Sequence, residues 1–345
     1  MTTTHIIATA NAALEAELAA AINNKTKPLG SLGRLEQLAA QIGLIQQTSQ
    51  PQLRDPAIIV FAGDHGVVAE GISAFPQDVT WQMVENFLAN GAAINVFARQ
   101  NDIALHVVDA GVNHDFGPRE KLLSMKVAAG TRNFAKEPAM SAAQCQAAMR
   151  NGAELVAGLS GNVLGFGEMG IGNTTAAAAI MHKLTGIAVV DCVGAGTGLS
   201  SEGIRRKQAV IEAAVVLHAD VIQPADVLAT FGGFEIATMV GAMLAAAERR
   251  MVLLIDGFIV TSALLVAARM QPAILDYCVF SHQSDESGHA RMLQALKVKP
   301  VLQLDLRLGE GTGAALVYPM LLAAVNFLNQ MATFSSAQVS EKSSD

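Results

Sequence analysis

The sequence is poor in aromatic residues, charged residues and cysteines, and each scarcity narrows what the protein can be. Aromatic residues make up 5% of the 345 positions and charged residues 15%, whereas hydrophobic residues reach 51%. Small aliphatic residues must therefore fill the core, which favours close helix–sheet packing over a β-sandwich. The three cysteines, Cys145, Cys192 and Cys278, cannot all pair, and they form no CxxC motif. Reduced thiols in a cytoplasmic protein fit this pattern.

Long apolar runs are also missing. No uninterrupted run reaches the roughly 20 residues that a membrane-spanning helix needs. The nearest segment, residues 251–269, is interrupted by Asp256 and Gly257 and predicts a buried strand followed by a helix. The first residues lack a basic region followed by an apolar stretch, so we expect no signal peptide. The net charge of −7 argues against nucleic acid as the main partner but leaves room for an anionic small substrate held by backbone N–H groups.

After residue 36, short β-rich runs alternate with Ala-rich helical segments. Most of the runs are apolar throughout, as strands buried on both faces should be. This alternation predicts an α/β fold with a mostly parallel sheet and helices on both faces. Helices are also expected near both ends, at residues 9–24 and 314–331, and the polar tail 335–345 is expected to fray. The predicted strands are 57–62, 103–109, 163–166, 187–192, 227–230, 251–255, 277–280 and 301–306.

Five loops rich in glycine or polar residues follow these elements. Ligands of parallel α/β sheets bind at the carboxyl ends of the strands, so loops gathered at that edge indicate a binding site. No HExxH motif or comparable ligand spacing occurs, and we therefore expect no metal. Ser284, between His282 and His289, is a candidate substrate ligand. The loops are 63–66, 165–175, 194–198, 281–289 and 309–313.

The second of these loops contains a literal GxGxxG at Gly165–Gly170, with Asp191 about 21 residues beyond it. Two details count against a dinucleotide site. Glu168 inside the loop would repel a pyrophosphate, and the capping residues come later, so the helix should begin beyond the glycines. A nucleotide-monophosphate site is favoured, with a dinucleotide site and a plain tight turn as alternatives. Its candidate phosphate ligands are Gly172, Asn173 and Thr174.

A third loop has glycines at alternate positions, a pattern that can form an anion-binding nest. Lys207 follows about two turns into the next helix, where it could support a phosphate or a ribose or simply be a solvated cation. The two interpretations of Lys207 are about equally supported. The candidate ligands in the loop are Gly194, Gly196 and Gly198.

Glu310 lies between Gly309 and Gly311, after a segment that alternates leucine with other residues up to Leu308. A carboxylate presented between glycines at a strand end points into a cleft, where apolar neighbours raise its pKa and make it a better base. The alternative is a carboxylate that only stabilises a helix N-terminus. Flanking glycines favour the functional interpretation.

Residues 75–83 join two aromatic residues, a proline and a methionine. They could form the wall of a pocket for a flat apolar ligand, with a glutamine as the polar handle. A helix start with core-facing Trp81 and Met83 explains the pattern equally well. The candidate pocket residues are Phe75, Gln82, Met83 and Leu308.

Taken together, the motifs resemble the nicotinate-nucleotide–dimethylbenzimidazole phosphoribosyltransferase family in order and spacing, over nearly the whole chain. Several of them are weak alone, but the combination is highly specific. The segments that carry the resemblance are Lys27–Gly33, Phe61–Val67, Gln82–Met83, Gly167–Thr175, Gly194–Gly198, Phe231–Glu235, Ser281–His282 and Leu308–Gly313.

The resemblance implies a Rossmann-like catalytic domain, residues 51–311, and a small helical domain built from both chain ends, residues 1–50 and 312–345. It also implies a homodimer. The family joins nicotinate mononucleotide and 5,6-dimethylbenzimidazole to give α-ribazole 5′-phosphate and nicotinate, a step of cobalamin nucleotide-loop assembly, without a cofactor. The family's catalytic base falls on Glu310, a second glutamate of its site on Glu168, and a lysine of its site on Lys207.

The residues suit this chemistry. Nicotinate leaves as a neutral pyridine, so no general acid is needed, whereas the attacking benzimidazole must lose one proton, which a single carboxylate can accept. A β donor and an α product place the two bases on opposite faces of the ribose. Two rival functions remain: an NAD-dependent oxidoreductase using Gly165–Gly170, and a non-catalytic nucleotide-binding module.

Overall fold

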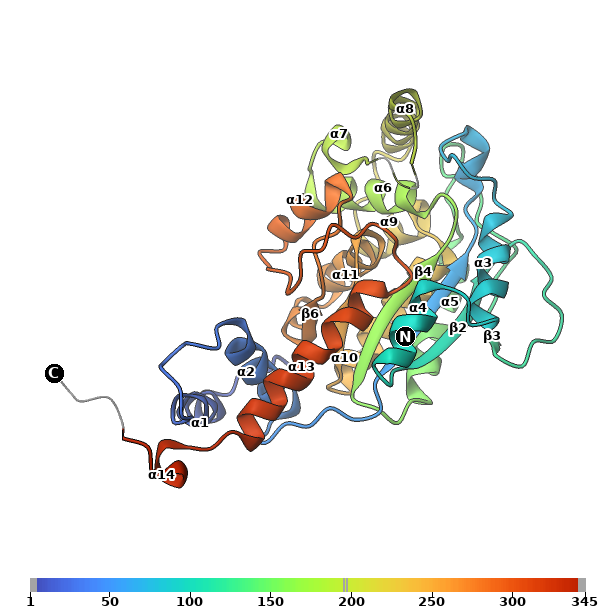
Figure 1. Cartoon of the computed structure of the whole chain (residues 1–345). Helices are drawn as coiled ribbons and strands as arrows, with labels where there is room; N and C mark the ends of the chain where they lie inside the picture. Colours follow the sequence, from blue (N-terminus) through green and yellow to red (C-terminus); the bar gives the residue numbers. More distant parts are fainter. Residues whose placement is uncertain (1–4, 195, 197, 341–345) are drawn as a thin grey trace.

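The computed structural model describes residues 5–194, 196 and 198–340, and it contains one parallel sheet covered by helices (Figure 1). The six strands follow the order β3-β2-β1-β4-β5-β6, and every pair is parallel. This is the strand order of a Rossmann fold, in which the chain reverses direction across the sheet between β1 and β4. The predicted α/β class is therefore confirmed. The strands are β1 (Ala57–Gly63), β2 (Ala104–Gly111), β3 (Leu122–Ser124), β4 (Val163–Met169), β5 (Val252–Ile255) and β6 (Cys278–Phe280).

The helices cover both faces of the sheet. Helix α10 packs on four strands and against α5, whereas α13 packs on β4 and against α4. In Figure 1, α13 lies in front of the strands and α10 behind them. The α-helices are α1 (Ala12–Asn23), α2 (Arg34–Gln46), α3 (Val79–Leu88), α4 (Ala93–Gln100), α5 (Ala142–Ala157), α6 (Asn173–Thr185), α7 (Val189–Cys192), α8 (Ser201–Leu217), α9 (Pro224–Phe231), α10 (Phe234–Glu248), α11 (Phe258–Met270), α12 (Ser287–Ala295), α13 (Thr312–Gln330) and α14 (Phe334–Ala337); η1 (Gly66–Glu70) and η2 (Pro272–Tyr277) are 3₁₀ helices.

Three of the predicted strands are wrong. Residues 227–230 belong to α9, which begins at a proline whose missing N–H costs nothing in a first helical turn. Residues 189–192 form the short helix α7, and 301–306 contribute only an isolated bridge between Leu302 and His282. Strand β3 was not predicted. Short apolar runs are compatible with buried helices as well as with buried strands, so periodicity alone could not separate them.

Both chain ends meet beside the sheet. The backbone N–H of Thr26 donates to Ala332 O at 3.0 Å, and Lys25 Nζ donates to Met331 O at 2.9 Å. Helices α1, α2 and α14 accordingly lie together, apart from the strands (Figure 1). The tail that was expected to fray contains α14, while residues 341–345 lie outside the described part of the chain.

Helix α13 carries Pro319 in its interior, where a proline removes one backbone hydrogen bond. The carbonyl four residues earlier, Ala315 O, is not left unpaired, because Asn101 Nδ2 donates to it at 3.1 Å. By length and composition α13 is also apolar enough to cross a membrane. The sequence did not indicate such a helix, because polar residues interrupt its apolar stretch. Its apolar residues pack against β4, α2 and α4, so the core of the fold accounts for them.

Candidate active site at the carboxyl edge of the sheet

A cavity of about 210 Å³ opens beyond the ends of β4, β5 and β6. Residues 168–174 follow β4, 257–260 follow β5, 282–286 follow β6, and the loop 307–310 closes the ring. The cavity therefore lies at the carboxyl edge, as the loops of the sequence predicted. The loop 63–66 does not line it but packs behind it, against Gly170.

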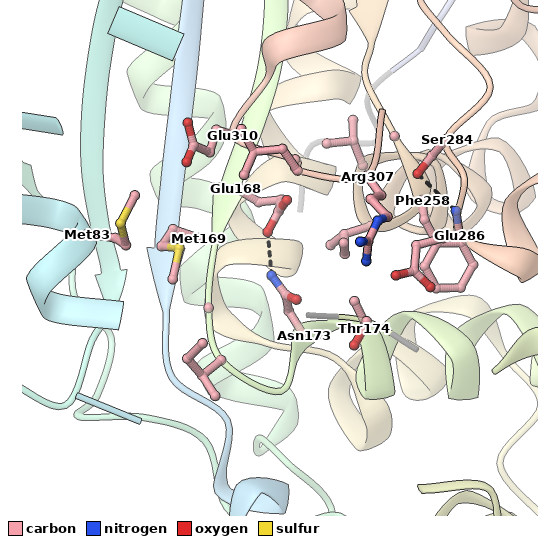
Figure 2. A pocket seen from close by; sticks show the side chains of 18 of the residues that line it. Met83, Glu168, Met169, Asn173, Thr174, Phe258, Ser284, Glu286, Arg307 and Glu310 are labelled. Atoms are coloured by element: carbon pink, nitrogen blue, oxygen red, sulfur yellow. Dashed lines mark hydrogen bonds between the residues drawn. The ribbon is translucent and has the colours of Figure 1, made fainter. Parts of the chain in front are cut away.

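The cavity has an apolar and a polar side. Met83 and Met169 lie on one side, whereas Arg307, Ser284 and Glu286 lie on the other, together with the ring of Phe258 (Figure 2). Glu168 and Asn173 stand between them (Figure 2). This division suits two ligand parts of different character, one flat and apolar and one charged.

Glu310 lines the cavity although its side chain is only 5% exposed. Its Oε2 accepts the N–H of Ile94, in the first turn of α4, at 3.3 Å. Burial raises the pKa of Glu310, the Ile94 hydrogen bond opposes the shift, and the charge of Asp256 adds to it. Glu310 thus both lies at a helix N-terminus and faces the cavity, so the two interpretations of this residue are not exclusive.

The backbone around Glu310 is held in an unusual conformation. Gly309, Glu310 and Gly311 have φ of 83°, 63° and 90°, a run of three left-handed residues. Glycine adopts this region freely, but glutamate does so at a cost of about 1 kcal/mol or more, and such strain gathers at functional sites. Gly167 on β4 makes the close approach possible, since a Cβ there would collide with Glu310 O.

Glu168 is the penultimate residue of β4 and is 6% exposed. Asn173 Nδ2 donates to its Oε2. Burial is the main reason why the pKa of Glu168 rises to about 8, and the nearby carboxylates of Asp256, Glu235 and Glu310 contribute. Burial therefore favours the protonated form of Glu168 in the ligand-free protein.

Lys207 is 1% exposed, which rules out the solvated cation that the sequence left open. It reaches from α8 to Thr174 on α6, with Nζ donating to Oγ1 at 2.7 Å. Burial lowers the pKa of Lys207 to about 8, and the charge of Glu286 works against that shift. A Cβ added to Gly196 would lie 3.6 Å from Lys207 Nζ, so the glycine loop, the lysine and the start of α6 meet in one corner that suits an anion, with Gly196 and Thr174 lining the cavity and Lys207 behind Thr174.

The remaining candidate phosphate ligands hold different positions around this corner. Gly172, with φ of 96°, is the N-cap of α6, and Asn173 and Thr174 line the cavity. Gly194 is buried and faces Glu286, whereas Gly198 is exposed. Ala195 and Thr197 of the same motif lie outside the described residues. The helix α6 begins beyond the glycines, as expected, which disfavours the dinucleotide interpretation.

A dinucleotide site would also need an acidic residue at the end of the next strand, and the structure has none at the predicted position. Asp191 does not end a strand but lies in α7, where it pairs with Arg291 at 2.9 Å. Its carboxylate is thus engaged away from the cavity.

His289 explains how Ser284 is held at the cavity. The backbone N–H of Ser284 donates to His289 Nδ1 at 2.9 Å, and Nε2 contacts Thr261 Oγ1 at 3.0 Å. Burial lowers the pKa of His289 to about 3, which favours the neutral ring. Because Nδ1 accepts the Ser284 N–H, the proton of the neutral ring lies on Nε2. His289 is therefore a structural support rather than a proton carrier at neutral pH.

Three of the four expected pocket residues, Phe75, Met83 and Leu308, line the cavity. Gln82 does not: it is exposed on α3 and is absent from the lining. A helix turns successive side chains by about 100°, so a pocket that receives Val79 and Met83 cannot receive Gln82 as well. Among the residues that the structure describes, no group of three or more His, Cys, Asp or Glu is arranged to hold a metal ion.

Several lining residues were missed in the sequence. Arg307 and Glu286 bring charges to the polar side, and Phe258 and Met169 contribute apolar surface. Arg307 precedes the glycine-flanked glutamate by three residues, a proximity that could have singled it out. The signal for Phe258 was weaker, because the preceding Asp256-Gly257 pair indicated only an interruption of an apolar segment.

Comparison with known proteins finds relatives that match almost the whole chain. A family model described as phosphoribosyltransferase matches residues 7–339. The chain is 70% identical to the nicotinate-nucleotide–dimethylbenzimidazole phosphoribosyltransferase of Janthinobacterium sp. (strain Marseille), covering 98% of this chain and 99% of that one. It is 60% identical to the protein of the same name from Dechloromonas aromatica (strain RCB), with 95% and 96% covered.

Solved structures agree with these relatives. The crystal structure of CobT from Thermus thermophilus superposes with a TM-score of 0.93 at 42% identity, covering 96% of this chain and 100% of that one. A second crystal structure from that organism, titled as the dimethylbenzimidazole phosphoribosyltransferase, gives 0.92 at 41% identity with the same coverage.

Proposed function

Because the chain belongs to the nicotinate-nucleotide–dimethylbenzimidazole phosphoribosyltransferase family, we propose that it transfers 5-phosphoribose from nicotinate mononucleotide to 5,6-dimethylbenzimidazole. The products are α-ribazole 5′-phosphate and nicotinate, and the step belongs to cobalamin nucleotide-loop assembly. The observation that carries this proposal is the two-sided cavity, in which Glu168 stands between an apolar side, where Glu310 lies, and a polar side that holds the anion-binding corner.

The apolar wall fits the benzimidazole. Phe75, Met83, Met169 and Leu308 offer a surface for a flat bicyclic base, and Glu310 lines the same cavity. As one nitrogen of the base attacks the ribose, its other nitrogen becomes acidic, and Glu310 accepts that proton. The raised pKa of Glu310 makes the carboxylate a stronger base than an exposed glutamate.

The polar side fits the donor. Thr174 and the buried Lys207 hold the phosphate at the N-terminus of α6, with Ser284 across the cavity. Glu286 shares this corner, where burial raises its pKa and so makes it bind a proton more readily than an exposed glutamate. Because the donor is a β anomer and the product an α anomer, the acceptor base must attack from the ribose face opposite nicotinate, which inverts the anomeric carbon.

We expect the purified protein to form α-ribazole phosphate from nicotinate mononucleotide and dimethylbenzimidazole without added metal. Chromatography with mass detection measures the product, and comparison with authentic α and β anomers gives its stereochemistry. The β anomer would overturn the proposed placement of the two bases. If no product forms and nicotinate is not released, the proposed function itself fails.

Glu168 is proposed to contact the ribose, either at a hydroxyl or beside the positive charge that develops as the glycosidic bond stretches. Glu168→Gln keeps the hydrogen bond from Asn173 but cannot become negative when positive charge develops on the ribose, so we expect kcat to fall about tenfold or more. The KM for nicotinate mononucleotide should change much less. Initial rates over both substrate concentrations separate the two constants, and equal losses in both would refute the role.

Three features from the sequence remain proposals. We propose that residues 1–50 and 312–345 form a small helical domain beside the catalytic domain 51–311, that the protein works as a homodimer, and that it works in the cytoplasm. The joined chain ends support the first, although the early turns of α13 pack on β4 and therefore belong to both parts. Sedimentation at several concentrations tests the second.

A further inference from the structure

A buried carboxylate behind Glu310 has no part in the reaction described above. Asp256 follows β5 at the carboxyl edge and is 1% exposed. Its Oδ2 accepts the N–H of Gly311 at 3.1 Å, and its Oδ1 accepts the N–H of Ala314 at the same distance. Gly311 directly follows Glu310, and Ala314 lies in the first turn of α13, so one side chain fastens both the loop and the start of the helix.

His282 faces this carboxylate from the loop after β6. Its Nε2 lies 3.6 Å from Asp256 Oδ1, and its side chain is 2% exposed. The ring also closes on Gly313, where an added Cβ would collide with it. Its Nδ1 has no hydrogen-bond partner among the described residues, so Asp256 provides the polar contact that orients the ring.

The loop needs such an anchor. Three consecutive left-handed residues, with glutamate in the middle, form a segment that relaxes unless its surroundings hold it. Gly309 O accepts hydrogen bonds from the backbone N–H and the hydroxyl of Thr312, and Asp256 holds the loop's other side. Glu310 itself is fixed by Ile94 at one carboxylate oxygen. The loop geometry on which Glu310 depends is thus built around Asp256.

We propose that Asp256, oriented by His282, is a positioning residue that holds Glu310 at the angle from which it accepts the benzimidazole proton. This inference rests on the proposed function. Asp256 has a second effect through its charge. The titratable groups around it are His282, Glu168 on β4 and Glu310, and the Asp256 charge raises the pKa of both glutamates. It therefore favours a Glu310 that binds protons more strongly.

Asp256→Asn tests the proposal. Asparagine has one acceptor oxygen for two N–H groups and carries no charge, so we expect kcat to fall about tenfold, the size usual within one hydrogen-bond network. KM for both substrates should stay within about twofold, because the residue does not line the cavity. Removing the negative charge lowers the pKa of Glu310, so the acid limb of the kcat–pH profile should move to lower pH. That shift reports the charge of Asp256, whereas a fall in kcat at nearly constant KM reports its positioning role.

A double-mutant cycle with Glu310→Gln separates positioning from general damage. Without the Glu310 carboxylate there is nothing to position, so Asp256→Asn should then change the residual rate by less than about twofold. His282→Gln should behave alike, with a smaller loss of kcat in the wild-type background that vanishes in Glu310→Gln. If Asp256→Asn does not fold, the His282→Gln cycle decides the question alone.

Asp109→Asn is the matched control. Asp109 is a buried carboxylate at the end of β2 that accepts the Val112 N–H at 2.9 Å, but it is absent from the cavity lining. Its loss should leave the position of the acid limb unchanged. Additive effects in the cycle, or a loss carried by KM, would overturn the positioning role. Wild-type product formation, measured in parallel, shows whether the proposed function holds independently of that result.

Discussion

Replacing Glu310 by glutamine should lower kcat by about 10²–10⁴-fold, the usual contribution of a positioned general base, while both KM values change little. The proton on the benzimidazole nitrogen then has only solvent to accept it, although the two substrates are still held together. Glutamine is the informative substitution because its oxygen can keep the hydrogen bond from Ile94 that the carboxylate makes in the wild type. The fold should consequently survive.

The pH profile provides an independent check of this role. A general base works when it is ionised, so kcat should fall as pH drops through the pKa of Glu310, which burial raises above the ordinary glutamate value. That acid limb should disappear in Glu310→Gln. Glu137→Gln is a suitable control, because Glu137 is exposed and pairs with Arg132 at 3.4 Å on the surface. A Glu310→Gln enzyme with near-wild-type kcat across the pH range would show that another group or solvent takes the proton.

Much of the sheet could be predicted because buried parallel strands have a simple signature. The runs that became β1, β2, β4, β5 and β6 are apolar, short and bounded by glycine or polar residues. The same signature misled at residues 227–230, which lie in a buried helix, and at 301–306, where the chain makes only one bridge. An apolar composition indicates that a segment is buried, but it does not show whether the segment packs as a strand or as a helix, because the tertiary fold decides that.

In the candidate site, too, residues with a local sequence signal could be predicted, whereas residues whose role depends on tertiary packing could not. Glu310 and Glu168 could be singled out because glycines surround them, and close backbone approach at Gly167 is the reason that glycine is needed. Asp256 could not be recognised in this way. Its role depends on β5 lying beside β4, so that the end of β5 faces the start of α13, more than 50 residues later in the chain. Lys207 remained ambiguous because only the packing of α8 against α6 buries it.

Replacing Lys207 by methionine should raise the KM for nicotinate mononucleotide by about 10–100-fold, because a charge-assisted hydrogen bond contributes roughly 1.5–3 kcal/mol. The KM for dimethylbenzimidazole should change little, since the apolar wall lies on the other side of the cavity. Lys183→Met is a matched control. Lys183 Nζ donates to His218 O at 3.0 Å from the last turn of α6, at the opposite end of that helix from Thr174.

The pKa of Lys207 makes a further part of this prediction. In the free protein the lysine is charged below about pH 8 and neutral above it, so donor binding should weaken as pH rises through that value. Lys207→Met should abolish this dependence, whereas Glu168→Gln should retain it, which separates the lysine from the glutamate that titrates in the same range.

The stability of the ligand-free protein should show the opposite pH dependence, because the contribution of Lys207 to the free energy of unfolding becomes more favourable as pH rises. A lysine whose pKa is lowered on folding costs stability as pH falls from its unfolded value near 10.5 through about 8, and the full cost applies at pH 7. Lys207→Met should therefore raise the Tm of the ligand-free protein at pH 7 while weakening donor binding, and a lower Tm with unchanged KM would mean that Lys207 is a structural residue rather than a phosphate ligand.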